Sequence, residues 1–141
     1  MSKVGNNEDD VLYGGDWLIF RAMRRRNGKL PAKEWFDGLD KRGMGRFLAR
    51  VANVESSWRS GRPPGDAIGK IEISSCGLWE LRVTPKGGTP PHLRALYLRR
   101  ERTMWLADGF TKRSNDLKER DVARGDTIAA EWLDNDGKTK S

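Results

Sequence analysis

The sequence predicts a small α+β fold in one domain, with two N-terminal helices and a C-terminal helix packed on an antiparallel sheet. Its 141 residues match the usual size of one domain. Four short segments are rich in apolar residues, as in strands, and one of them, residues 78–84, alternates clearly. Apolar residues recur at three- and four-residue spacing after the first segment, as in helices. The order of strand, two helices, three strands and helix favours helices that cover one face of the sheet.

In the N-terminal half, a strand is expected over residues 17–22 because they are rich in aromatic and aliphatic side chains. Pro31 suits the first turn of a helix, where its missing N–H costs little. Gly43 and Gly45 predict a break, and a second helix then continues until Gly61. Its apolar residues, which we expect to pack in the core, are Met44, Phe47, Leu48, Val51, Val54 and Trp58.

In the C-terminal half, three strands are expected over residues 78–84, 92–100 and 102–110. Short turns join them into an antiparallel meander. Together with the first strand, this meander forms the predicted sheet. A final helix is expected over residues 114–133.

The expected domain spans residues 17–133, between polar, flexible tails at residues 1–16 and 134–141. The N-terminal tail contains no apolar stretch of the kind found in secretory signals. The apolar run at residues 17–20 is far too short to span a bilayer. We therefore expect a cytoplasmic protein with no membrane partner.

The chain is basic: 27 Lys and Arg against 20 Asp and Glu give a formal charge of +7. An excess of positive charge favours a polyanionic partner. With Cys76 as the one cysteine, an internal disulfide is excluded. His92 is the one histidine, so there are too few nitrogen and sulfur ligands for a typical metal site. No metal and no cofactor are expected.

Positively charged side chains lie on or beside the predicted strands. Arg82 and Arg94 stand inside apolar strands, where an unpaired charge is costly to bury. Two interpretations stay open: an ion pair with Glu80, or anion binding by Arg82, Arg94, Lys112 and Arg113 on one concave face of the sheet. The planar fork of arginine suits the second, because it binds phosphate oxygens in pairs.

RNA can be cleaved without a metal by in-line attack of its own 2′-hydroxyl. An enzyme for this reaction aligns the chain and stabilises the charge on the phosphorane. Arginine and lysine can stabilise that charge, but they are poor general bases at their ordinary pKa.

Three segments, residues 78–82 (LWELR), 93–97 (LRALY) and 108–113 (DGFTKR), occur in the order and spacing of a known toxin family. In these motifs the chain resembles the RelE/HigB superfamily toxins of type II toxin-antitoxin systems. It is most similar to the HigB branch, which includes phage-derived members. The order of the predicted elements over residues 17–133 is similar as well.

This resemblance implies a ribosome-dependent mRNA endoribonuclease, or mRNA interferase, that inhibits translation. Such toxins enter the ribosomal A site and cut mRNA there by 2′-hydroxyl attack without a metal. The resemblance also implies a cognate antitoxin, encoded nearby and, as is common in this branch, of the helix-turn-helix type. By position, Arg94 matches the strand arginine that contacts the scissile phosphate. Lys112 or Arg113 matches the group that stabilises charge or donates a proton, and Arg82 helps to shape the basic cleft.

The proton-transferring groups are less defined, because the chain lacks the tyrosine that RelE has after its Lys/Arg pair. By resemblance to HigB, the candidates are His92 and Asp108. Histidine is the side chain most often used for acid–base catalysis near neutral pH, which is the functional interpretation of His92. The simpler interpretation, which the residues favour, is a histidine at the end of a loop with no catalytic role.

Further candidates for RNA binding lie in two turns. Arg24, Arg25 and Arg26 form a basic turn that is either simply solvated or contacts rRNA phosphates. Lys86, in a glycine-rich loop, either reaches a phosphate or is a mobile surface lysine.

Two other functions compete with the nuclease. A ParE-like protein has a similar fold but inhibits DNA gyrase by binding, without catalysis. A basic RNA-binding phage accessory protein would use its cations for affinity alone. The retained cations Arg82, Arg94, Lys112 and Arg113 favour the nuclease over the gyrase inhibitor.

Overall fold

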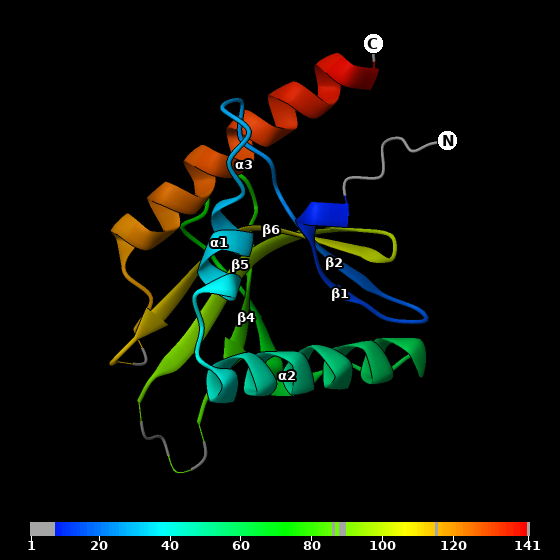
Figure 1. Ribbon diagram of the computed structural model, residues 1–141, viewed down its shortest axis with the longest axis vertical. Coiled ribbons are helices and arrows are strands. Elements are labelled where there is room, and N and C mark those ends of the chain that lie inside the picture. Colours follow the sequence, from blue (N-terminus) through cyan, green and yellow to red (C-terminus); the bar gives the residue numbers. More distant parts are fainter. Residues whose placement is uncertain (1–7, 86, 88–89, 115, 141) are drawn as a thin grey trace.

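A six-stranded sheet, with strands in the order β1-β2-β6-β5-β4-β3, forms the centre of the fold (Figure 1). The computed structural model describes residues 8–85, 87, 90–114 and 116–140. The strands are β1 (Val11–Gly14), β2 (Ile19–Ala22), β3 (Ile68–Lys70), β4 (Trp79–Val83), β5 (His92–Arg100) and β6 (Thr103–Lys112). β2 and β6 are parallel, and the other neighbours are antiparallel. The predicted α+β class and the antiparallel meander of β4, β5 and β6 are confirmed.

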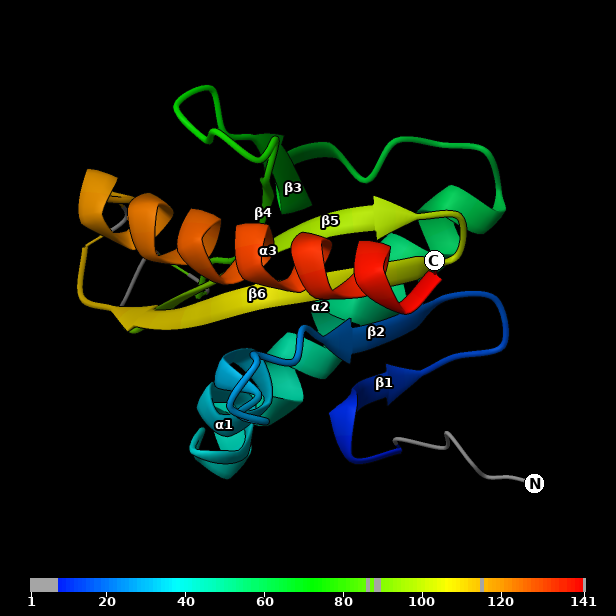
Figure 2. The same cartoon turned by 90° about the horizontal axis from the view of Figure 1, so that it is seen from above.

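The helices are α1 (Pro31–Asp37), α2 (Lys41–Arg59) and α3 (Glu119–Lys140), with short 3-10 turns η1 (Glu8–Asp10) and η2 (Gly65–Ala67). They cover both faces of the sheet, which corrects the expectation of a single covered face. Figure 2 shows α3 over β5 and β6, with α1 and α2 beyond the sheet. In the described part of the chain, no helix is both long enough and apolar enough to cross a membrane.

Alternation along β5 explains the two covered faces. Ala95 and Tyr97 belong to one apolar core, with Phe36 of α1 and Phe47 of α2. Leu96, between them, belongs to a second core that contains the apolar face of α3. Successive strand residues point to opposite faces, so a central strand that is buried on both sides needs a helix layer on each.

The break between the first two helices comes earlier than predicted. α1 begins at Pro31, as expected, and ends before Gly38. The Asp40 carboxylate then accepts a hydrogen bond from the Gly43 backbone N–H at 2.7 Å and caps α2. Gly43 and Gly45 therefore lie inside α2, because a good N-cap outweighs the modest cost of glycine within a helix.

Both predicted tail boundaries need correction. Residues 11–14, assigned to a tail, form β1 on β2, and Asp10 beside them forms an ion pair with Arg21 at 2.9 Å. At the other end, α3 begins at Glu119, five residues later than predicted, and continues to Lys140. Its polar second half is fixed to the body of the protein by an ion pair between Asp134 and Arg26 at 2.7 Å.

Candidate active site

The strand register brings most of the predicted site residues onto one face of the sheet. Arg82 of β4 lies directly opposite Arg94 of β5. His92 of β5 lies directly opposite Lys112 of β6. Positions opposite each other, or two apart along a strand, share a face, and this is the face that α3 covers. We call this set the polar strip: Glu80, Arg82, His92, Arg94, Asp108 and Lys112.

Arg94 lies at the centre of the polar strip and is almost fully buried, with 2% of its surface exposed. Its Nη1 donates a hydrogen bond to the Leu93 carbonyl oxygen at 3.0 Å. Burial lowers the pKa of Arg94 and nearby Arg82 lowers it further, whereas the Glu80 carboxylate opposes this. The predicted phosphate-contacting arginine is therefore a fixed charge beneath the surface of this structure.

Arg82 forms the ion pair that the sequence left as one of two interpretations. Its Nε lies 2.6 Å from the Oε1 of Glu80. Its guanidinium also lies over Gly69 of β3, where an ideal Cβ would come within 2.2 Å of Nη2. Glycine at this position leaves the space that the arginine needs, a requirement that sequence reasoning missed.

Lys112 is paired with a residue that the sequence did not indicate. Its Nζ forms a short ion pair with Asp121 in the first turn of α3. The same carboxylate accepts a hydrogen bond from the Lys118 backbone N–H at 3.3 Å, just before the helix. One side chain thus caps α3 and ties its start to the end of β6.

Lys112 and Arg113 also reach solvent, at a cavity of about 350 Å³ that they line with Pro90, Pro91 and Thr111. Arg113 is exposed. This cavity lies at the end of the polar strip, where an external phosphate can contact Lys112 and Arg113.

His92 lies at the end of a loop, as expected, but its side chain is buried. It is the first residue of β5 and is 5% exposed. Its Nδ1 is buried and has no hydrogen-bond partner among the described residues. A buried polar atom without a hydrogen bond costs folding free energy, and such atoms often have a catalytic role. The unpaired ring nitrogen favours the interpretation of His92 as a group that exchanges a proton with a substrate.

Asp108 is 2% exposed, and its Oδ1 accepts a hydrogen bond from the Gly109 backbone N–H at 2.9 Å. The Nε of Arg124 lies 3.1 Å from Oδ2, which accepts no hydrogen bond from the described residues. Burial raises the pKa of Asp108, and the Gly109 N–H and the Arg124 charge only partly offset this. The neutral acid is thereby favoured relative to an exposed aspartate.

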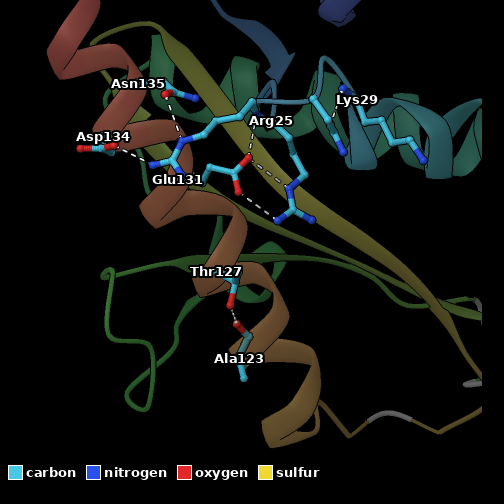
Figure 3. A network of polar contacts seen from close by, with 9 residues as sticks. Arg25, Lys29, Ala123, Thr127, Glu131, Asp134 and Asn135 are labelled. Carbon is cyan, nitrogen blue, oxygen red and sulfur yellow. Dashed lines mark hydrogen bonds and ion pairs between the residues drawn. The ribbon is translucent and has the colours of Figure 1, made fainter.

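The basic turn lies beside Asp108 of the polar strip, and acidic partners hold its arginines. Arg24 pairs with Asp9 at 2.8 Å. Figure 3 shows Glu131 of α3 bound to Arg25, whose Nη2 lies 3.1 Å from Oε2. The ion pair between Arg26 and Asp134 completes the set. These ion pairs compete with any RNA phosphate for the three guanidinium groups. Lys86, the other RNA-binding candidate, lies outside the described residues.

Sequence reasoning missed the residues of α3 that partner the strip, Asp121 and Arg124. A weak signal was present: two charges three residues apart flank Val122, which packs in the core. Among the described residues, no three His, Cys, Asp or Glu side chains are grouped so as to hold a metal ion.

Comparison with known proteins adds no family to this geometry. No protein-family model matches the chain, and no curated protein matches its sequence. The protein is thus described by its fold class and its site: it is a basic α+β chain with a strip of cations across three strands. Its function has to be argued from that strip and from the motifs within it.

Proposed function

We propose that this chain is a toxin that acts as a ribosome-dependent mRNA endoribonuclease. One observation supports the proposal above the others. Arg82, Arg94 and Lys112 come from three different strands and lie at neighbouring register positions on one face. The RelE/HigB resemblance assigns contact with the scissile phosphate to Arg94, charge stabilisation to Lys112 or Arg113, and shaping of the basic cleft to Arg82.

The proposed reaction is in-line transesterification. The 2′-oxygen of one nucleotide attacks the adjacent phosphorus and loses its proton, and the bond from phosphorus to the 5′-oxygen breaks. The products are a 2′,3′-cyclic phosphate and a 5′-hydroxyl, which takes up a proton. Lys112 and Arg113, at the open cavity, contact the phosphate, while buried Arg94 adds fixed positive charge behind them. Preorganised charge of this kind is an effective way to stabilise a transition state.

His92 is the strip residue best placed to exchange a proton, because it lies directly opposite Lys112. A phosphate that reaches Lys112 has to compete with the Asp121 carboxylate for the ammonium group. The helix-turn-helix antitoxin and the ribosomal A site remain the expected partners, and cytoplasmic action follows from the same proposal.

The test is translation of a defined mRNA in an extract, with 5′ ends mapped by primer extension and with parallel samples that lack ribosomes. We expect cuts within codons that require ribosomes and fall about 100-fold in Lys112→Ala, the usual scale for loss of one charge-stabilising donor. Arg94→Ala should abolish cutting. Lys41→Ala removes an exposed lysine at the start of α2 and serves as the matched control.

Because Arg94 is buried, each variant is first compared with the parent by circular dichroism and thermal unfolding. Uncut mRNA together with unaffected translation would refute the nuclease. DNA damage that precedes any block of translation would point to the gyrase inhibitor instead.

RNA binding without cleavage is a second candidate, and one surface favours it. Arg42, Arg46 and Arg50 recur every four residues along α2 and so lie on one helix face. Within the described residues none of the three forms an ion pair, in contrast to the arginines of the basic turn. Unpaired cations in a row suit the phosphate backbone of RNA.

This candidate makes its own prediction for the parent chain and the Arg42→Ala, Arg46→Ala, Arg50→Ala triple variant. RNA affinity should fall steeply with salt, and the triple variant should flatten the slope of log K against log[salt] by about 3, or about 1 per phosphate contact. Filter binding at several salt concentrations measures the slope. An unchanged slope would show that this helix face does not contact RNA.

A further inference from the structure

A second cleft, of about 520 Å³, opens beside β6 and is separate from the cavity at Lys112. Its walls come from the basic turn, the start of α1, the middle of β6 and the first half of α3. The residues that matter are Arg25, Lys29, Trp35, Asp108 and Arg124. From the sequence, Asp108 is a proton-transfer candidate and Arg25 an RNA-binding candidate, but the proposed cleavage reaction uses none of these five residues.

The Trp35 indole forms a fixed wall of this cleft. An ideal Cβ at Gly109 would lie 2.1 Å from the Trp35 Cε3, so the indole rests directly on the glycine backbone. Trp35 Nε1 donates a hydrogen bond to Thr111 Oγ1 at 3.0 Å. Trp35 faces this cleft, and Thr111 faces the neighbouring cavity at Lys112. The half-buried Trp35 indole is therefore already fixed in place in the ligand-free protein.

The polar walls of the cleft carry three cations: Arg25 and Lys29 from the turn between β2 and α1, and Arg124 from α3. Glu131 binds Arg25 (Figure 3). Buried Asp108 lies beside the Nε of Arg124. The Arg124 side chain is 63% exposed, so its outer nitrogens remain open to a ligand. Lys29 forms no ion pair within the described chain. Buried Asp108 and exposed Glu34 are the carboxylates among the lining residues.

We propose that this cleft binds a ribonucleotide, with the phosphate on Lys29 and Arg124 and the planar base against Trp35. The cations select a phosphate, since arginine and lysine are its usual ligands. The volume lies within the range of small-ligand sites and is far larger than a bare phosphate needs. Bases stack readily on aromatic side chains, and Trp35 supplies one. The inference goes beyond the proposed function, because binding here requires neither cleavage nor ribosomes.

Isothermal titration calorimetry of the full chain with adenosine 5′-monophosphate, adenosine and inorganic phosphate tests the proposal. We expect the nucleotide to bind at one site, and adenosine and phosphate to bind at least about tenfold more weakly, because each lacks half of the contacts. Lys29→Ala and Arg124→Lys should each weaken nucleotide binding by about tenfold. Lys41→Ala, an exposed lysine on α2 that does not line the cleft, should leave it unchanged.

A second measurement locates the site without relying on the Arg124 variant, which loses a neighbour of buried Asp108. In ¹⁵N–¹H spectra the Trp35 indole signal, assigned with Trp35→Phe, should shift on addition of the nucleotide. The Trp79 signal should stay in place. Equal affinity for phosphate and nucleotide would overturn the base contact. Absence of saturable binding would overturn the cleft proposal, whatever the ribosomal cleavage assay shows.

Discussion

Replacement of Gly109 by alanine is expected to lower the free energy of unfolding by about 3 kcal/mol, at the upper end of the usual cost of overpacking. The new methyl group would lie 2.1 Å from the Trp35 ring. The indole has no easy way to move aside, because it donates to Thr111 and packs edge-on against Phe47 at 5.5 Å between ring centroids. Urea denaturation followed by circular dichroism measures the loss.

The matched control is the same substitution at a glycine with open space. Gly45 lies inside α2, and nothing lies within 4 Å of its ideal Cβ. Gly45→Ala is therefore expected to raise the free energy of unfolding by about 0.5–1 kcal/mol, the difference in helix propensity. If the two substitutions gave the same result, Trp35 would not be wedged against Gly109, and the rigid wall of the second cleft would be refuted.

The part of the fold that could be predicted from the sequence depends on local signals. β5 has the predicted bounds, because its nine residues lie between Pro90-Pro91 and the turn at residues 101–102. α1 begins at Pro31 for an equally local reason. β1 and β3 have four and three residues, too few for a recognisable alternation. The parallel pairing of β2 with β6 joins segments far apart in the chain, which no local pattern encodes.

The candidate site, too, has a part that local sequence patterns predict and a part that depends on tertiary packing. Alternation within β4 and β5 places Arg82, Arg94 and His92 on one face, and this follows from the sequence. The burial of Arg94 and the pairing of Lys112 with Asp121 depend on where α3 docks, which is a tertiary result. The partners of the basic turn are more distant still: Arg25 meets Glu131 across a separation of 106 residues.

Replacement of Glu55 by alanine is the other change with a large expected effect, again about 3 kcal/mol of unfolding free energy. This glutamate of α2 accepts a hydrogen bond from the Tyr13 hydroxyl at 2.5 Å and from the Trp17 and Leu18 backbone N–H groups, both at 2.7 Å. It therefore ties α2 to the turn between β1 and β2. Loss of the acceptor leaves partly buried donors unsatisfied, at about 1–3 kcal/mol each.

The control for this change is Glu34→Ala, which removes an exposed glutamate of α1 and should alter the unfolding free energy by at most about 0.5 kcal/mol. Guanidinium titrations of the parent chain and both variants supply the three values. An effect of Glu55→Ala no larger than that of Glu34→Ala would show that the β1–β2 turn holds its shape without the carboxylate.

The dependence of this stabilisation on pH has a defined sign at each end. Burial raises the pKa of Glu55, but hydrogen bonds from Tyr13, Trp17 and Leu18 and the charge of Arg59 together lower it below its ordinary value of 4.5. A lowered pKa means that the stabilisation by Glu55 is complete above the ordinary value and is lost as pH falls through the folded-state pKa.

The hydrogen bond to Glu55, aided by burial, raises the pKa of Tyr13 to about 12. Its contribution is thus complete below pH 10, the ordinary tyrosine value, and is lost as pH rises through about 12. The difference in stability between the parent chain and Glu55→Ala should therefore be largest between about pH 5 and pH 9 and should shrink on both sides. A difference that stayed constant from pH 7 down to pH 3 would mean that the ionised carboxylate is not what these donors recognise.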